Sequence, residues 1–428
     1  MSTFAIATLG CKVNSFESES YLESLVERGY EEVDFKQKAD VYIINTCCVT
    51  NTAASKSRQR ISQAQRNNPD ALLCVVGCYV QTHAEDLKAQ LGIDILIGAN
   101  GKADLASRID DALKHQTHFV EDTKQAIPVF EELKVSQFQH QTRAFLKIQD
   151  GCDQFCAYCI IPFARGRERS LAPQDVMAQA RILSESHPEI VLAGIHTGRY
   201  GKEHRSDLTQ MIKEILIEAP KLKRIRISSI EVTEITDEFI DLMKNEPRIA
   251  RHLHIPIQSG CDATLQRMKR PYTVHAFLER IAAIRKALPD ISISSDLIVG
   301  FPQENEEEFL VTLNTVKKAQ FSFMHVFPYS KRANTEAADM AGQNDPQCKK
   351  QRVQAAQLTS NKLKTDYQLS LIGDQLEVII EEVDENGAFG HSSEYLPVFI
   401  KNSTHQPKDL VVLIAVDRVD GNVIGEER

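Results

Sequence analysis

Short apolar runs alternate with amphipathic stretches along the first hundred residues. This pattern predicts strands at residues 4–9, 40–45, 71–76 and 93–97, with helices at 16–28, 53–67 and 83–91 between them. The alternation is typical of an open α/β domain with a parallel sheet. Residues 115–141 are polar and lose the rhythm, so we interpret them as a linker with room for one short strand.

The strand and helix rhythm resumes at Arg143 and continues for six units. Predicted strands cover 143–148, 190–195, 224–230, 252–257, 291–298 and 321–327, and predicted helices include 173–186, 209–218, 274–287 and 306–318. Six units are two short of a closed eightfold barrel. We therefore predict a partial, open (β/α)6 barrel with its chemistry at the C-terminal ends of the strands.

The last part of the chain changes character again. A basic helix is predicted at 347–370, followed by short strands and turns at 376–381, 384–387, 390–393, 397–401, 410–416 and 420–422. A small five-stranded β-barrel fits this spacing. The predicted domains are 1–115, 138–368 and 369–428.

Composition narrows the class of protein. The chain has 428 residues and 42% apolar content, enough for about three domains that each bury a core. Ten cysteines are too few for a small disulfide scaffold, and no stretch approaches 18 uninterrupted apolar residues. We expect no membrane span and a cytoplasmic location, where clustered cysteines are more often metal ligands or catalysts than disulfides.

The net charge of −9 argues mildly against a nucleic-acid partner, but it is unevenly distributed. Residues 371–428 hold twelve acidic side chains against four basic ones, a formal charge of −8, which leaves about −1 for the rest. The rest includes basic clusters at 165–169, 221–226 and 349–352. Net charge therefore does not exclude a nucleic-acid partner.

Three cysteines follow the first strand of the predicted barrel with Cys-x3-Cys-x2-Cys spacing: Cys152, Cys156 and Cys159. Three thiolates can hold three corners of a 4Fe–4S cluster and leave the fourth iron open to a substrate or cofactor. Zinc sites usually have four protein ligands, and His187 and His196 are distant in sequence, so zinc fits less well.

This spacing at the first strand of a partial barrel resembles the radical S-adenosylmethionine superfamily. The resemblance implies that the open iron chelates the cofactor, and that an electron from the cluster cleaves it to a 5′-deoxyadenosyl radical that abstracts hydrogen. It also implies a cofactor pocket formed by Tyr158, Gly194, Glu231 and Asp296. Packing or helix capping explains these four residues as well. His252 and His254 share one face of a strand, which suits a barrel lining or a satisfied core pair.

Three further cysteines, Cys11, Cys47 and Cys78, each follow a different predicted strand of the N-terminal domain. The C-terminal ends of parallel strands line one crevice, so these thiols fit a second three-ligand cluster. Three separate core thiols are the alternative. Cys48 stands next to Cys47 and leaves the choice between them open. No ligand role is expected for Cys74, Cys261 and Cys348.

Together with the triplet, the segments Thr8–Ser18, Asn45–Cys47 and Gly77–Cys78 resemble the radical methylthiotransferases. The resemblance covers essentially the whole chain, because the β-rich tail is placed like the TRAM module of that family. The form Leu9–Asn14 is similar to the branch that acts on threonylcarbamoyladenosine in tRNA, adjacent to the anticodon on its 3′ side. This implies an enzyme that adds a methylthio group to C2 of that adenine. Isopentenyladenosine or a ribosomal-protein side chain is the alternative acceptor, and a non-catalytic iron–sulfur RNA-binding or sulfur-carrier protein is the alternative class.

The resemblance further implies two 4Fe–4S clusters, with S-adenosylmethionine as both radical source and methyl donor. The Cys152, Cys156 and Cys159 cluster would generate the radical, and the upstream cluster would hold or donate sulfur. Implied partners are the tRNA anticodon loop and a flavodoxin- or ferredoxin-type electron donor, with no membrane. The charge of the tail is at odds with RNA binding, so we expect contact through a local face: Phe389, His391, Tyr395 and Lys401, helped by the 165–169 loop and the basic helix.

Overall fold

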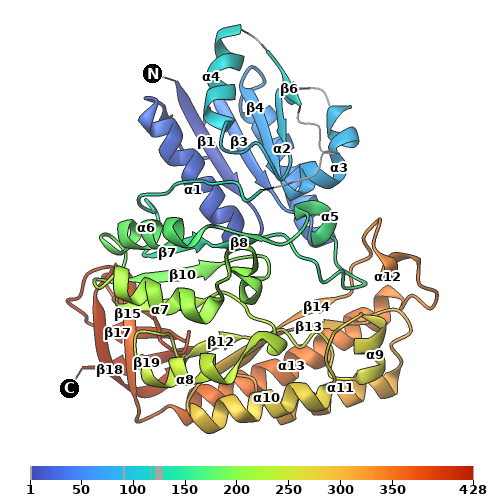
Figure 1. Ribbon diagram of the computed structural model, residues 1–428, viewed down its shortest axis with the longest axis vertical. Helices are drawn as coiled ribbons and strands as arrows, with labels where there is room; N and C mark the ends of the chain where they lie inside the picture. Colours follow the sequence, from blue (N-terminus) through green and yellow to red (C-terminus); the bar gives the residue numbers. More distant parts are fainter. Residues whose placement is uncertain (1, 90–91, 116, 121–128, 428) are drawn as a thin grey trace.

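The computed structural model describes residues 2–89, 92–115, 117–120 and 129–427. Its N-terminal part is a parallel sheet in the order β2-β1-β3-β4-β5-β6 with helices against it (Figure 1). The strands are β1 (Thr3–Thr8), β2 (Glu31–Glu32), β3 (Val41–Thr46), β4 (Leu72–Gly77), β5 (Ile95–Ile97) and β6 (Phe119–Val120). The helices are α1 (Lys12–Glu27), α2 (Asn51–Asn67), α3 (Cys78–Lys88) and α4 (Leu105–His115).

Both faces of this sheet are buried, which explains why its central strands β3 and β4 begin with uninterrupted apolar runs. In β3, Tyr42 and Ile44 pack into one apolar cluster, and Val41 and Ile43 pack into another on the opposite face. The predicted open α/β sheet is confirmed. The short strand predicted within residues 115–141 corresponds to β6. Residues 116 and 121–128 of that segment lie outside the described ranges.

Helix α3 begins earlier than the sequence predicts. It begins at Cys78, directly after Gly77, rather than at His83, and His83 has non-helical backbone angles inside it. Gly77 has a φ of +97°, and a Cβ there would lie 2.7 Å from Asn45 Oδ1, so this sharp turn favours glycine. The consequence is that Cys78 occupies the first turn of a helix.

The central part is the predicted partial barrel. Two parallel three-stranded sheets, β11-β10-β7 and β12-β13-β14, are joined by a bridge between Ile225 and Ile249. The strands are β7 (Arg143–Lys147), β10 (Glu189–Ala193), β11 (Arg224–Ile227), β12 (His252–His254), β13 (Ser292–Val299) and β14 (Phe323–Pro328), with a small β8 (Gln149–Asp150) and β9 (Arg169–Ser170) pair.

Helices cover the outside of the barrel (Figure 1). The helices of this part of the chain are α5 (Ile161–Arg165), α6 (Pro173–Ser184), α7 (Leu208–Glu218), α8 (Asp237–Asn245), α9 (Asp262–Arg267), α10 (Val274–Ala287), α11 (Glu306–Ala319), α12 (Glu336–Asp339) and α13 (Pro346–Ser370), with 3-10 turns at Thr197–Arg199, Lys202–His204 and Val232–Glu234. Of these, α5 packs against α3 of the N-terminal domain and not on the outside of the barrel. Across the described ranges, no helix combines the length and apolar character needed to cross a membrane.

The C-terminal part is a closed five-stranded barrel, as predicted, in the order β15-β16-β17-β19-β18. Its strands are β15 (Gln375–Asp384), β16 (Gly387–Ser392), β17 (Pro397–Lys401), β18 (Leu410–Val419) and β19 (Asn422–Glu426). Alternate residues such as Leu376, Val378 and Ile380 point into its apolar interior.

Two buried arginines of β11 join the small barrel to the partial barrel. Arg224 Nη2 donates to the carbonyl of Glu377 at 2.8 Å, and Arg226 Nη1 donates to the carbonyl of Ser393 at 3.0 Å. Both pair with buried Glu189; burial would raise the pKa of this carboxyl, but the charges of Arg226 and Arg224 lower it to about 2. These two members of the basic cluster at 221–226 are therefore structural and do not form a basic surface.

Candidate functional site

A cavity of about 380 Å³ lies inside the open barrel, and all three parts of the chain line it. The N-terminal domain contributes Cys11, Lys12 and Val13, the small barrel contributes Tyr395, and the partial barrel contributes Ala193, Gly194, Ser228, Ser229, His252, His254, Pro256, Ser294, Asp296, Phe323 and His325. Of the two sets of cysteines that the sequence singles out, the upstream set contributes Cys11 to the described lining, and the triplet contributes none of its members.

The three upstream cysteines come together at the C-terminal ends of β1, β3 and β4. Gly10 has a φ of +105°, and a Cβ there would lie 3.0 Å from Cys47 Sγ, so Cys47 packs directly against the residue before Cys11. Burial is the largest cause that raises the pKa of Cys11 and that of Cys47, the latter to about 11. The charge of Cys78 adds to the rise in both, and the charge of Cys11 adds to it in Cys47. The three thiols therefore lie within electrostatic reach of one another.

Asn14 fixes the loops that carry two of these cysteines. Its side-chain amide donates to the carbonyl of Leu9 at 2.6 Å and to that of Thr46 at 3.0 Å, which are residues next to or near Cys11 and Cys47. This contact explains structurally why an asparagine stands three residues after Cys11.

Cys48 occupies a different position from Cys47. It is buried, and its pKa is raised, first by a hydrogen bond to Cys78 and then by burial. The same hydrogen bond, helped by the charge of Arg165, lowers the pKa of Cys78 to about 6 against the effect of burial. Cys48 is thus a donor to the Cys78 sulfur, whereas Cys47 interacts with both Cys11 and Cys78.

The triplet Cys152, Cys156 and Cys159 lies on the loop between β8 and α5. Arg270 Nη1 donates to Cys156 Sγ at 3.2 Å, and His196 Nδ1 lies 3.4 Å from Cys152 Sγ. Burial is the main reason that the pKa of Cys159 rises to about 12. His196 is distant from the triplet in sequence, but the fold places its ring next to Cys152.

His187 stays away from the triplet, because its ring nitrogens contact the backbone of Phe138 and Thr142. Within the described ranges, no group of three or more His, Cys, Asp and Glu side chains is arranged to hold a single metal ion. In a 4Fe–4S cluster each thiolate binds a different iron, so its ligands do not converge on one point.

The residues expected at the cofactor are not all in one place. Gly194 and Asp296 line the cavity, and a Cβ on Gly194 would lie 3.0 Å from Thr197 Oγ1. Glu231 pairs with Arg270, the donor to Cys156. Tyr158 is packed against an apolar cluster that includes Met268 and Tyr329, outside the cavity lining. Two of the four thus face the cavity, and Glu231 reaches the triplet through an arginine.

Several residues at the site are not among those that the sequence motifs identify. Arg270 contacts Cys156 across 114 positions, and no local pattern marks it. Phe323 and His325 line the cavity from alternate positions of β14, so their period of two on a predicted strand could have identified them. His252 and His254 do line the cavity, and both contact the Ser294 hydroxyl, at 2.8 and 2.9 Å.

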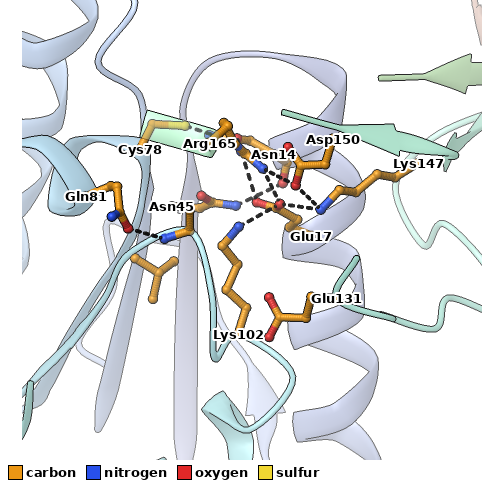
Figure 2. A network of polar contacts seen from close by, with 12 residues as sticks. Asn14, Glu17, Asn45, Cys78, Gln81, Lys102, Glu131, Lys147, Asp150 and Arg165 are labelled. Carbon is orange, nitrogen blue, oxygen red and sulfur yellow. Dashed lines mark hydrogen bonds and ion pairs between the residues drawn. The ribbon is translucent and has the colours of Figure 1, made fainter. Parts of the chain in front are cut away.

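A buried ion cluster joins the N-terminal domain to the barrel beside the upstream cysteines; Figure 2 shows it. Its members are Glu17, Lys102, Lys147, Asp150 and Arg165. Arg165 also donates through Nε to Cys78 Sγ at 3.0 Å and through Nη2 to Asn14 Oδ1 at 2.6 Å. This interdomain ion cluster therefore holds a guanidinium against a cysteine sulfur.

The expected RNA contact through the 165–169 loop is wrong for two of its arginines. Arg165 is fully buried and Arg169 is buried against Asp150, because two buried carboxylates require cations as partners. Only Arg167 of the three is exposed, at 74% of its side chain. In the basic helix, Arg352 is likewise buried and paired with Glu304. Tyr395 faces the cavity, with the Arg226 guanidinium 4.9 Å from its ring centre.

Comparison with known proteins agrees with this architecture. Residues 3–98 match the family described as Uncharacterized protein family UPF0004, and residues 146–316 match the Radical SAM superfamily. The structure of the radical S-adenosylmethionine methyltransferase TsrM from Kitasatospora setae has a TM-score of 0.57 at 14% identity, covering 79% of this chain and 77% of that one. At that identity the likeness concerns the fold alone.

Sequence relatives cover nearly the whole chain. Threonylcarbamoyladenosine tRNA methylthiotransferase MtaB of Bacillus subtilis (strain 168) is 45% identical over 94% of this chain and 91% of its own. The protein of the same name from Aquifex aeolicus (strain VF5) is 34% identical over 89% and 93%. The tRNA-2-methylthio-N(6)-dimethylallyladenosine synthase of Thermoanaerobacter sp. (strain X514) is 35% identical over 89% and 83%. The two family matches follow one another along the chain, and the relatives are similar over most of their own length and of this chain. This protein therefore belongs to the radical S-adenosylmethionine methylthiotransferase family.

Proposed function

We propose that this enzyme adds a methylthio group to C2 of N6-threonylcarbamoyladenosine, next to the anticodon of tRNA on its 3′ side. The observation that carries this proposal is the 45% identity, over 94% of the chain, to a relative named for that nucleoside, against 35% for the one named for dimethylallyladenosine. The cavity supports it, because Cys11 of the upstream set lines it together with residues of the partial barrel such as Gly194 and Asp296.

The donor sets fit two 4Fe–4S clusters. Each set offers three thiols and one guanidinium donor to a sulfur, Arg165 at Cys78 and Arg270 at Cys156, which favours the thiolate form that binds iron. We assign one cluster to Cys11, Cys47 and Cys78, and the other to Cys152, Cys156 and Cys159. When bound, the clusters would supply the electron that cleaves S-adenosylmethionine to a hydrogen-abstracting radical, and the sulfur; S-adenosylmethionine would also supply the methyl group.

The residues of this chain position the reactants. Gly194 lines the cavity beside β10, with Thr197 and Gln149 packed against it, and Asp296 presents a carboxylate to the same cavity. Glu231 holds Arg270 against Cys156 and so acts through that arginine. We also keep Tyr158 in the cofactor pocket as a proposal, since it lies in the loop between Cys156 and Cys159.

The proposed partners are a tRNA anticodon loop and a flavodoxin- or ferredoxin-type electron donor, and the proposed location is the cytoplasm. For RNA contact we retain exposed Lys401 and half-buried Phe389, and add exposed Arg167. His391 is paired with Glu381 at 3.0 Å. We propose domain boundaries at 1–115, 138–368 and 369–428, which separate the three architectures described above.

Deletion of the gene tests the function directly. Mass spectrometry of tRNA nucleosides is expected to show loss of 2-methylthio-N6-threonylcarbamoyladenosine and accumulation of its unmethylthiolated precursor, while isopentenyladenosine derivatives are unchanged. Wild-type protein supplied from a plasmid should restore the product. Loss of the methylthio form of isopentenyladenosine would assign the enzyme to that substrate, and unaltered tRNA with an altered ribosomal protein would assign it to the protein acceptor.

The choice between Cys47 and Cys48 can be settled by iron content. With two clusters, anaerobically reconstituted protein is expected to bind about eight irons, the Cys47→Ala variant about four, and the Cys48→Ala variant about eight. The reason is that Cys47 lies near both Cys11 and Cys78, whereas Cys48 is a donor to Cys78. Iron and sulfide assays check this. If Cys48→Ala lost four irons and Cys47→Ala lost none, the assignment would be reversed.

A further inference from the structure

Lys12 is a cation that lines the cavity and has no counter-ion among the residues that the structure describes. It is the first residue of α1, directly after Cys11, and it is half-buried. Its position differs from that of the other cations nearby, because Lys102, Lys147 and Arg165 are all buried in ion pairs. Among the residues that the structure describes, Lys12 has no ion-pair or hydrogen-bond partner for its ammonium group.

The other charged groups of the cavity do not neutralise it. Asp296 is the one carboxylate among the described lining residues, and His254 Nε2 already lies 3.2 Å from its Oδ2 atom. Burial is the main cause of the lowered pKa of His252 and His325, and the charge of Lys12 adds to it in both. The ammonium group of Lys12 therefore acts on the interior of the cavity, not only on solvent.

The proposed substrate carries a group that needs such a cation. The threonylcarbamoyl substituent on N6 ends in a carboxylate, whereas an isopentenyl substituent is a neutral hydrocarbon. Moving a carboxylate from water into a partly enclosed site is costly unless a charged or hydrogen-bonding partner meets it. A lysine on a flexible stem supplies a mobile positive charge for that purpose.

We propose that Lys12 binds the carboxylate of the threonylcarbamoyl group and thereby selects this nucleoside over one with an apolar N6 substituent; the inference rests on the function proposed above. The ammonium group donates a charge-assisted hydrogen bond to the carboxylate when the base enters the cavity. Lys12 is adjacent to Cys11, so the same short segment would bind the substrate and hold one corner of the upstream cluster.

The effect should appear as selectivity rather than as overall loss. A site that offers a charge to a substrate group discriminates against analogues that lack the group. Lys12 is only half-buried, so we expect a contribution typical of a single charge-assisted hydrogen bond, about tenfold in affinity. A lysine that instead contacted the RNA backbone would change the affinity of every RNA equally.

The test compares two anticodon stem-loops of one sequence, carrying threonylcarbamoyladenosine or isopentenyladenosine at the target position. Their dissociation constants are measured by fluorescence anisotropy on the reconstituted enzyme. The Lys12→Met variant is expected to lower the preference for the threonylcarbamoyl stem-loop about tenfold, and Lys12→Arg is expected to retain it. Lys38→Met removes an exposed lysine of the same domain and should leave the preference unchanged.

The ratio of the two constants is the decisive quantity, because partial loss of cluster or of folded protein affects both stem-loops alike. An unchanged ratio in Lys12→Met, including an equal weakening of both stem-loops, overturns the inference. The proposed function fails separately, if wild-type enzyme forms no methylthio product on the threonylcarbamoyl stem-loop. Product formation by wild type together with an unchanged ratio in Lys12→Met would leave the function standing and remove only the role of Lys12.

Discussion

Replacing Glu17 with glutamine is expected to lower the free energy of unfolding by about 3–5 kcal/mol, because it removes a fully buried carboxylate from three buried cations. Glu17 Oε1 lies 2.8 Å from Lys102 Nζ, 3.1 Å from Lys147 Nζ and 2.6 Å from Arg165 Nη1. Burial alone would raise the pKa of this carboxyl, but the three cations hold it well below its usual range. Glutamine is nearly isosteric, so urea unfolding followed by circular dichroism would report the loss of charge.

Two further variants make this result specific. Glu27→Gln changes an exposed glutamate of the same helix and is expected to cost less than about 0.5 kcal/mol. Adding Lys102→Met to Glu17→Gln removes one of the stranded cations and should recover part of the loss. If Glu17→Gln were no more destabilising than Glu27→Gln, the ion cluster would not be a source of stability.

The chain order of strands and helices could be predicted because burial imposes its period on the sequence. Strand β3 is buried on both faces and begins with a continuous apolar run, and helix α10 is found at the predicted residues 274–287. The predicted start of α3, at His83, is wrong. The reason is local: His83 interrupts the helical backbone angles, so the amphipathic pattern is clear only after the break, while the helix begins at Cys78.

The cysteine sets were visible in the sequence because ligands at strand ends need no knowledge of distant partners. The roles of the buried arginines could not be predicted, since a sequence does not reveal which charges are buried. Arg165 and Arg224 look like parts of basic surface clusters, yet both are fully buried. Their partners, Glu17 and Glu189, lie 148 and 35 residues away, and only the fold brings them together.

The two cysteine sets share one feature that the sequence does not contain. Each has a guanidinium held against one sulfur by a carboxylate: Glu17 holds Arg165 at Cys78, and Glu231 holds Arg270 at Cys156. Arg165 also belongs to the cluster that joins the two domains. The Arg165 guanidinium that contacts the Cys78 sulfur is thus also part of the ion cluster that holds the N-terminal domain against the barrel.

Replacing Cys156 with alanine is expected to abolish formation of 5′-deoxyadenosine, with a yield below about 1% of wild type, because two thiolates do not hold the cluster that three thiolates are proposed to bind. The measurement is chromatography of the reaction of anaerobically reconstituted protein with S-adenosylmethionine and a reductant. Cys261→Ala is the matched control, since Cys261 is also buried but lies outside both sets.

Iron content separates this effect from misfolding. The triple alanine variant of Cys152, Cys156 and Cys159 is expected to retain about four irons on the upstream cysteines, against about eight in the intact protein. Loss of all iron from that variant would mean that the two sets do not bind clusters independently, and an intact protein that never exceeded four irons would contradict the second cluster. Continued production of 5′-deoxyadenosine by Cys156→Ala would contradict the assignment of this triplet as the radical-generating site.

Arg270 donates to Cys156 Sγ, so Arg270→Met should retain the iron and lower the yield of 5′-deoxyadenosine only in part, which distinguishes a positioning residue from a ligand.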